Sequence, residues 1–426
     1  MTRTRLISTW CLVLLASTCL ASNAFASDRF EAGCLEDCSQ CGATVCSCPD
    51  YSFCDQAYLF PQKDCGFNLR GWIDAGFIGN VSDPGSKFNG PYNGVDRSNE
   101  VMLNQFYLIG ERALPQYGWG MGGRVDVLYG EDYFLAESTG FERRQTGAAH
   151  WNPEYYGVAF PQAYIDFGNQ DLSLQLGHFY SIMGYEGVMA PDNFFYSKSY
   201  SYQFAGPFQH WGGQVNYNLN ESWSVQLGLV NGWDALDRVS DDLSFIGKIK
   251  YEGPTGIWSS FAVLTGKEYN NQANLNLPRN DFENRTRYSW LVGLPLTCRL
   301  EYVFHHWLGA QQDGALDGGT AYWYGIDQYL YYSINNCWKL GARFEWFRDD
   351  DGTRVGLNRP NNPNNGPYVG DFYSLALGLN WKPRTNLMVR PEIRCDWFDG
   401  DAVVDPFDDG ADSSQLMLGI DAILFY

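Results

Sequence analysis

Basic and acidic residues recur at every second position in several segments of this 426-residue chain. In an extended segment such residues share one face, so each segment carries its charges on one side. Rows of this kind suit the wall of a water-filled passage, where opposite charges set up a field that sorts solutes. For any single residue, neutralisation in a salt bridge that braces the wall is the better-supported interpretation. The rows contain Arg124, Asp126, Lys248, Lys250, Arg299, Arg343, Glu345, Arg390 and Arg394.

Seven cysteines lie close together between residues 34 and 65, at Cys34, Cys38, Cys41, Cys46, Cys48, Cys54 and Cys65. In an exported protein this spacing favours a disulfide framework, because a piece of about 40 residues has too small a core to fold without cross-links. Cys38 and Cys41 could instead form half a metal site or a redox pair. Haem attachment is disfavoured because Gly42 stands where that motif needs His. The odd number leaves one thiol free, interchain or paired with a distant cysteine.

Motifs of enzymes and metal sites are weak in this chain. Gly118 to Gly123 matches the G-x-G-x-x-G spacing, but a strand pattern follows it where that motif must open a helix. The adjacent His305 and His306 face opposite sides of an extended segment, and the acidic runs 349–351 and 399–412 lack calcium-loop spacing. We therefore expect no catalytic, cofactor or metal site, although a Ser and His pair on different strands remains an alternative.

The N-terminus predicts export. Arg3 and Arg5 precede an apolar run, and Ala24-Phe25-Ala26 forms a small-x-small cleavage site, so residues 1–26 are predicted to be a signal peptide. Its removal takes the formal net charge from −20 to −22, because it holds two basic residues and no acid. Such a charge disfavours nucleic acid as a partner.

The composition favours a β-barrel that spans a membrane. Aromatic residues make up 16% of the chain, with 28 Tyr and 15 Trp, yet the mean hydropathy is only −0.32. No mature segment has the run of about 18 apolar residues that a helical span needs. The final segment places Leu416, Leu418, Ile420, Ala422, Leu424 and Tyr426 on one face and Asp421 on the other. Alternation of lipid-facing and water-facing residues is typical of a barrel strand.

Period-two segments predict sixteen antiparallel strands, near 67–79, 101–112, 121–131, 161–168, 171–180, 209–219, 222–231, 243–252, 256–266, 285–294, 296–307, 320–333, 336–348, 370–381, 385–398 and 415–426. Short and long connections alternate along the chain. Barrels of outer membranes have short periplasmic turns and long external loops. Both termini are then periplasmic, as is the Cys-rich segment 27–65, and residues 66–426 form the barrel.

The third and longest loop, 181–208, is too aromatic for an ordinary exposed loop. Its rings need burial, and the barrel interior is the place available, so we expect the loop to fold inward and narrow the passage. The candidates for this constriction are Glu186, Asp192, Phe194, Phe195, Tyr196 and Lys198.

Over residues 66–426 the chain resembles the OmpL-like β-barrel porins. The residues that carry the resemblance are Leu103-Asn-Gln-Phe-Tyr107, Gly123-Arg-Val-Asp-Val-Leu-Tyr129, Pro161-Gln-Ala-Tyr164, Gly177-His-Phe-Tyr180, Gly184-Tyr-Glu186 and Asn193-Phe-Phe-Tyr-Ser197. The resemblance implies a signal peptide, one outer-membrane barrel and passive diffusion of small hydrophilic solutes or ions. It supplies no catalytic motif, defines the solute poorly and does not include residues 27–65.

Three alternatives remain open from the sequence: a surface adhesin or receptor built on a barrel, a barrel enzyme, and a soluble carbohydrate-binding sandwich. The expected partners are outer-membrane lipid and small hydrophilic solutes. A homotrimer is expected only by analogy with other sixteen-stranded porins. The Cys-rich segment is a candidate contact for a periplasmic or cell-envelope partner.

Overall fold

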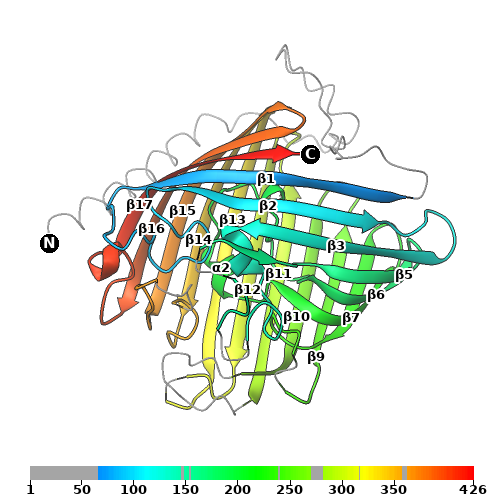
Figure 1. The fold of residues 1–426 in the computed structure, drawn as a ribbon, viewed down its shortest axis with the longest axis horizontal. Coiled ribbons are helices and arrows are strands. Elements are labelled where there is room, and N and C mark those ends of the chain that lie inside the picture. The colour runs from blue at the N-terminus through cyan, green and yellow to red at the C-terminus, as the bar shows by residue number, and fades with distance from the viewer. Residues whose placement is uncertain are drawn as a thin grey trace.

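The computed structural model describes residues 66–144, 148–152, 155–237, 240–269, 282–315, 317–356 and 362–426. The predictions made for the signal peptide and the Cys-rich segment lie outside these residues. The described strands form one antiparallel sheet that closes on itself (Figure 1). No described helix is long and apolar enough to cross a membrane, a finding that does not bear on β-barrels.

The strands in chain order are β1 (Phe67–Asn80), β2 (Val101–Arg112), β3 (Gly120–Gly130), β4 (Gly157–Ala159), β5 (Ala163–Gly168), β6 (Leu172–Tyr180), β7 (Gln209–Asn218), β8 (Trp223–Val230), β9 (Ser244–Glu252), β10 (Trp258–Tyr269), β11 (Phe282–Pro295), β12 (Leu300–Gln311), β13 (Ala321–Asn335), β14 (Trp338–Asp349), β15 (Val369–Arg384), β16 (Leu387–Asp401) and β17 (Ser414–Phe425). Consecutive strands pair with one another, except that β4 and β5 both pair with β3. β1 pairs with β17 to close the barrel, with Ala75 opposite Ala422.

The barrel has sixteen strand positions around its wall. β4 and β5 both pair with β3 and together occupy one of these positions. The predicted fourth strand, 161–168, therefore starts too late: pairing begins at Gly157 and is interrupted at residues 160–162. Pro161 lies in this gap and has no N–H to donate to the ladder. Gln162 still connects this segment to β3, because Asp126 N donates a hydrogen bond of 2.8 Å to the Gln162 carbonyl oxygen.

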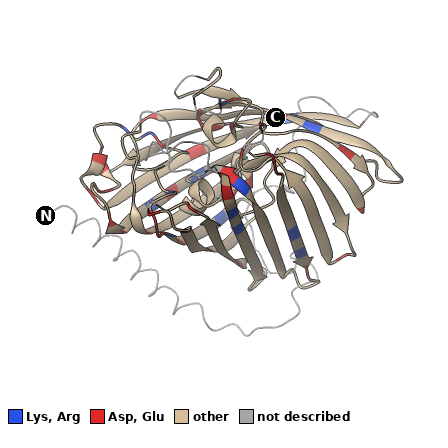
Figure 2. Ribbon diagram, turned by 90° about the horizontal axis from the view of Figure 1, so that it is seen from below, with Lys and Arg blue, Asp and Glu red and all other residues tan. Residues whose placement is uncertain are grey.

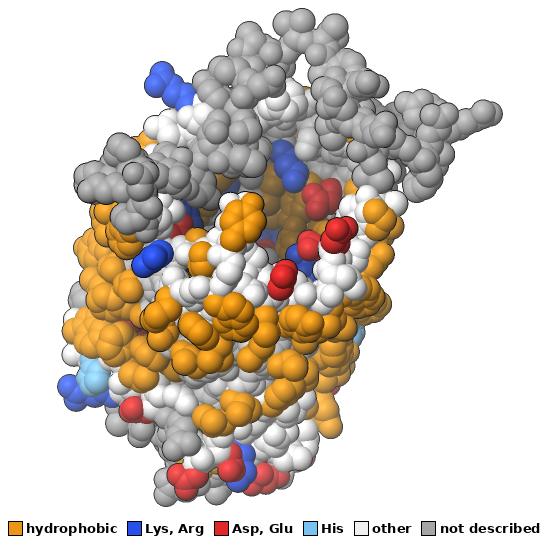
Figure 3. All heavy atoms as spheres, turned by 90° about the vertical axis from the view of Figure 1, so that its right-hand side faces the viewer, with side chains coloured by type: hydrophobic (Ala, Val, Ile, Leu, Met, Phe, Trp, Pro, Cys, Tyr) orange, Lys and Arg blue, Asp and Glu red, His pale blue; other side chains and the backbone are white. Residues whose placement is uncertain are grey.

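Side chains alternate between a buried inner face and an apolar outer face, as the sequence predicts. On β17, Leu418, Ile420 and Leu424 are exposed, whereas Met417 and Asp421 are buried inside. Hydrophobic side chains gather over the outer face of the strands, and a hollow opens at one end of the barrel (Figure 3). An apolar exterior around a polar interior is what a barrel in lipid requires.

The connections alternate in length. Residues 169–171, 219–222 and 336–337 are short turns that contain or follow an Asn, namely Asn169, Asn220 and Asn335. The Oδ1 of each Asn accepts hydrogen bonds from the N–H groups of the last turn residue and the first residue of the next strand. This side-chain turn lets the chain reverse within a few residues. The long connections include residues 81–100, 131–156, 181–208, 350–368 and 402–413. The termini of the barrel, at β1 and β17, lie on the side of the short turns.

Several long loops pack on one another at the opposite end of the barrel. Asn362 Nδ2 donates to Gly90 O over 3.0 Å, and Ser86 N donates to Asp409 Oδ2 over 2.8 Å. These contacts join loops 81–100, 350–368 and 402–413. Together, these three loops cover part of the lumen at this end of the barrel.

Replacement of Ile420 by Arg tests the lipid-facing surface. Ile420 is 47% exposed and lies midway along β17, between Phe77 and Pro391. A charge near the bilayer midplane costs roughly 2–4 kcal/mol, so Ile420→Arg should lower the free energy of unfolding in lipid vesicles by about that amount. Ile420→Leu is the control and should change it little. Equal stabilities of the two variants would contradict a lipid-facing position.

Candidate functional site

The loop of residues 181–208, called here the constriction loop, folds into the barrel. It contains the short helices η4 (Ala190–Asp192) and α2 (Tyr200–Phe204), and α2 lies within the ring of strands (Figure 1). Its two ends are joined where Ser181 N donates to Phe208 O over 2.9 Å. The sequence prediction that this loop lies inside the barrel is confirmed by this placement.

Three arginines of the wall bind the backbone of the constriction loop. Arg343 on β14 donates to Ser197 O over 2.9 Å, and Arg390 on β16 donates to Asn193 O over 2.6 Å. Arg394, also on β16, donates to Lys198 O over 2.5 Å. A loop with little helix has many carbonyl groups without partners, and guanidinium groups carry enough donors to satisfy them. These three residues form the arginine clamp.

Wall carboxylates bind the N–H groups of the same loop. Glu345 accepts from Tyr200 N over 2.8 Å and from Ser201 N over 2.6 Å, at the start of α2. Glu392 accepts from Ser197 N over 3.1 Å. Basic and acidic residues consequently lie close together around the loop in the barrel interior (Figure 2).

Glu186 joins loop and wall by a buried ion pair. Its Oε1 lies 2.6 Å from Arg343 Nη1, and the two side chains are 6% and 0% exposed. Burial opposes ionisation of Glu186, but the charges of Arg343 and Lys198 outweigh it, and the pKa of Glu186 lies below its usual value. Lys198 is 5% exposed and donates to Gly187 O over 3.0 Å. Burial lowers the pKa of Lys198.

The aromatic rings of the constriction loop dock where the wall carries glycine. A Cβ atom on Gly341 would lie 2.3 Å from Phe194 Cε1, and one on Gly76 would lie 2.5 Å from the Tyr196 ring. Phe195 stacks under the Arg343 guanidinium, whose Cζ is 4.9 Å from the ring centroid. A larger wall residue at either position would require these rings to shift.

Of the six residues predicted for the constriction, Glu186 and Asp192 line open space, and the other four serve mainly to dock the loop. Phe194, Phe195, Tyr196 and Lys198 pack against the wall or hydrogen-bond within the interior. The sequence prediction thus located the loop but did not separate residues that line open space from residues that pack against the wall.

The predicted wall residues also include some that bind the loop or form ion pairs and one that lines open space. Arg343, Glu345, Arg390 and Arg394 hold the loop, and Arg124 pairs with Asp126 at 2.7 Å. Lys250 pairs with Glu252 at 2.7 Å, while Lys248 faces open space. Arg299 was predicted on a strand and instead lies in the short turn 296–299, because β12 starts at Leu300.

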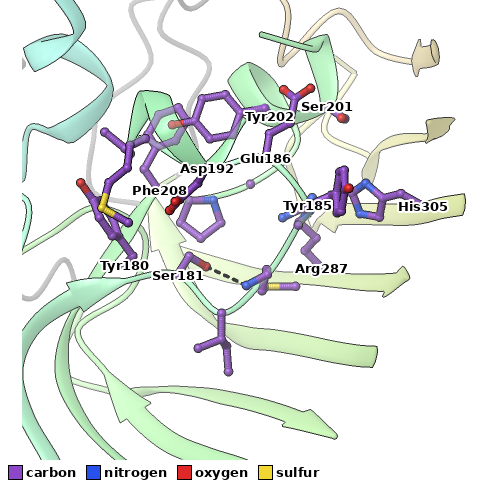
Figure 4. Close-up of a pocket in the computed structure, with 18 of the residues that line it drawn as sticks. Tyr180, Ser181, Tyr185, Glu186, Asp192, Ser201, Tyr202, Phe208, Arg287 and His305 are labelled. Carbon is purple, nitrogen blue, oxygen red and sulfur yellow. Dashed lines mark hydrogen bonds between the residues drawn. The ribbon is translucent and has the colours of Figure 1, made fainter. Parts of the chain in front are cut away.

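A cavity of about 290 Å³ remains between the constriction loop and the wall. It is lined by Tyr180, Asp192, Tyr202 and Phe208 on one side and by Tyr185, Arg287 and His305 on the other (Figure 4). Lys248 and Tyr329 complete its wall. We call this space the open cavity.

Arg287 on β11 was missed by the sequence analysis, although a signal was present. Arg285, Arg287 and Ser289 alternate with Tyr288 and Trp290, the pattern that identified the other charged rows. Arg287 lines the open cavity and is 3% exposed.

Three neighbouring strands carry a Ser, His and Asp chain. Ser289 Oγ lies 2.9 Å from His305 Nε2, and His305 Nδ1 lies 2.7 Å from Asp327 Oδ2. This is the connectivity of a hydrolase triad. However, Ser289 is 2% exposed, and Gly184 N donates to its Oγ over 3.2 Å. Asp327 also accepts from Ser201 Oγ over 2.7 Å. The nucleophile position is covered, and the chain ties the constriction loop to the wall.

Among the described residues, no three His, Cys, Asp or Glu side chains gather closely enough to hold a metal ion. The arrangement is therefore best described as a narrowed, charged and aromatic passage inside a barrel wall.

Comparison with known proteins agrees with this description. A family model described as "Putative beta-barrel porin-2, OmpL-like" matches residues 66–426. No curated protein sequence matches the chain.

Three solved structures show the same fold at low identity. The outer membrane channel DcaP of Acinetobacter baumannii is 13% identical, with a TM-score of 0.57, 86% of this chain covered and 99% of that chain. The anion-selective porin from Comamonas acidovorans is 10% identical, with a TM-score of 0.56 and coverages of 84% and 99%. OmpT of Vibrio cholerae in its trimer form is 10% identical, with a TM-score of 0.51 and coverages of 84% and 99%.

A double-mutant cycle on Arg343 and Glu186 measures the arginine clamp. Arg343→Met leaves the Glu186 carboxylate buried without its partner, which typically costs about 3–5 kcal/mol of unfolding free energy. Glu186→Gln in that background should recover part of the loss, with a coupling of at least about 1 kcal/mol. The measurement is urea unfolding of the folded barrel in lipid vesicles.

Lys250→Met is the matched control for the clamp. Lys250 and Glu252 form an ion pair whose side chains are 37% and 60% exposed, so its loss should cost under about 1 kcal/mol. If Arg343→Met costs no more than this control, the clamp does not stabilise the barrel.

Proposed function

Because the chain belongs to the OmpL-like β-barrel porin family, we propose that its solutes cross the outer membrane along the open cavity beside the constriction loop. The protein is an outer-membrane channel for passive diffusion of small hydrophilic solutes or ions. The proposal adds the route, the residues along it and the orientation of the barrel.

The proposed route is supported by the position of the constriction loop, which fills one side of the lumen and leaves the other side open. The constriction loop is bound to β14 and β16 by the arginine clamp, and the open cavity lies on the opposite side, against β9, β11 and β12. Glu186 and Asp192 face it from the loop, and Lys248 and Arg287 face it from the wall. Acids on one side and bases on the other create a transverse field, which orders water and disfavours apolar solutes.

We further propose that the short turns and both ends of the barrel face the periplasm. The length difference between the two sets of connections supports this orientation, since outer-membrane barrels keep their long loops outside. The acidic loops 350–368 and 402–413 would then meet the external medium. The Cys-rich segment would emerge on the periplasmic side, within reach of a cell-envelope partner.

A homotrimer is the assembly we propose, in keeping with the trimer form of Vibrio cholerae OmpT. Support comes from the shared sixteen-stranded architecture alone. Analytical ultracentrifugation in density-matched detergent would give the number of chains per particle.

Single-channel recording tests the route. The mature chain, folded in detergent and added to a planar bilayer, should give current steps of reproducible size in KCl. Asp192→Asn should shift the reversal potential in a salt gradient toward anion preference, because it removes a loop carboxylate that forms no ion pair with a described residue. Lys250→Gln, on the wall but paired with Glu252, is the control and should shift it less.

Silence from a correctly folded barrel would contradict the channel and favour an adhesin or receptor whose external loops close the lumen. Hydrolysis of a p-nitrophenyl ester that is abolished by Ser289→Ala would instead support the barrel-enzyme alternative.

Epitope insertion tests the orientation. Val403 is 97% exposed in loop 402–413, so an epitope placed after it should be stained by antibody on intact cells. The same epitope between Asn220 and Glu221, in a short turn, should be stained only after the outer membrane is permeabilised. The reverse staining pattern would invert the proposed topology.

A further inference from the structure

Arg287 is a buried cation that lacks a partner among the described residues. Its Nε has no hydrogen-bond acceptor, and no described carboxylate lies within ion-pair distance of its guanidinium. Asp327 is the carboxylate that acts on it electrostatically, but no hydrogen bond or ion pair joins the two, and Oδ2 of Asp327 binds His305 and Ser201 instead. By contrast, Arg343 and Arg390 are both bound to carboxylates and to loop carbonyls.

A buried charge is expensive unless it is paired, so an unpaired guanidinium at a cavity wall indicates a group whose partner arrives from solution. Arg287 lines the open cavity directly. A guanidinium presents two parallel N–H groups that match the two oxygens of a carboxylate.

Lys248 supplies a second cation to the same space. It lies on β9, separated from β11 only by β10, so the two strands are about 10 Å apart. Lys248 forms no hydrogen bond or ion pair with any described residue, and it too lines the open cavity. Of the two acids that face this space, Glu186 is neutralised by Arg343, whereas Asp192 forms no close ion pair with a described residue.

The guanidinium lies close to the backbone of Gly206 in the constriction loop. A Cβ atom on Gly206 would lie 1.9 Å from Arg287 Nη1, so a larger residue there would require the end of the Arg287 side chain to move. The far face of Arg287 is directed at Trp307, with Cζ 6.0 Å from the ring centroid. Both contacts limit the directions in which the guanidinium can turn.

Five aromatic side chains contribute to the remaining wall, namely Tyr180, Tyr185, Tyr202, Phe208 and Tyr329. Sites for small molecules combine such apolar surface with a few converging polar groups, and a cavity of about 290 Å³ is near the lower end of their size range.

We propose that Arg287 and Lys248 form a subsite in the open cavity for the carboxylate of a small organic acid, whose apolar body packs on the surrounding rings. The inference rests on the proposed diffusion route and adds the chemical class of a preferred solute. Uncharged solutes of the same shape lack the group that neutralises Arg287.

The test is block of the KCl current by benzoate in a planar bilayer that contains the full mature chain. Each variant is compared with its own KCl current, and benzyl alcohol serves as the uncharged analogue. Benzoate should reduce the wild-type current at a concentration at least tenfold below that of benzyl alcohol. Arg287→Gln should raise the half-blocking concentration of benzoate about tenfold, equivalent to about 1.4 kcal/mol. Lys248→Gln should raise it in the same direction.

Arg285→Gln is the matched control, since Arg285 lies on the same strand and is equally buried at 3% but borders a different pocket. It should leave benzoate block within twofold of wild type. Gly206→Ala keeps the charge but displaces the guanidinium, and should weaken block as Arg287→Gln does. Heat-modifiability on gels identifies variants that have folded.

The outcomes separate the two proposals. A folded wild-type barrel without KCl current contradicts the diffusion route itself. A conducting barrel that benzoate does not block, that benzyl alcohol blocks equally, or whose block survives both Arg287→Gln and Lys248→Gln overturns the subsite and leaves the route standing.

Discussion

The bond between wall arginines and the backbone of the constriction loop is the interaction on which the interior depends. A loop of 28 residues inside a barrel brings backbone carbonyls into a space with little room for water, and each one that stays unsatisfied destabilises the fold. Arg343, Arg390 and Arg394 supply the missing donors.

The clamp acts together with the shape of the wall. Gly76 and Gly341 leave depressions that receive Tyr196 and Phe194, so the strands that carry the loop are recessed where its rings dock. Clamp and depressions lie on β1, β14 and β16, which are close together because the barrel closes between β1 and β17. The loop is therefore held against one side of the lumen, and the open cavity is what remains on the other side.

The sequence predicted what depends on local periodicity. Alternation of apolar and polar residues identified all sixteen strand positions. The lengths of the connections distinguished the end of the barrel with short turns from the end with long loops. The start of the predicted fourth strand was misplaced at Pro161, because a proline interrupts strand pairing. In the structure, residues on both sides of this interruption pair with β3. Arg299 was misplaced because the turn before β12 has no glycine or Asn signal to mark its end.

What could not be predicted depends on contacts between distant residues. Glu186 and Arg343 are 157 positions apart, and no local pattern reveals that they meet. The same limit explains why the sequence did not show that Phe194, Phe195, Tyr196 and Lys198 pack or hydrogen-bond inside the barrel. Their residue types are right for either role, and only the direction in which the loop leans decides between them.

The roles of the wall charges follow from the position of the constriction loop, which lies against one side of the lumen. Arg343, Glu345, Arg390 and Arg394 each bind backbone groups of the constriction loop, and this role is structural. Arg287 and Lys248 line the open cavity, and no described residue of the loop forms a hydrogen bond or ion pair with them. By leaning toward β14 and β16, the constriction loop both stabilises the barrel and decides which charges remain available to a passing solute. Loop anchoring and the solute recognition that we propose are thus two consequences of one packing arrangement, and a substitution that releases the loop should alter both together.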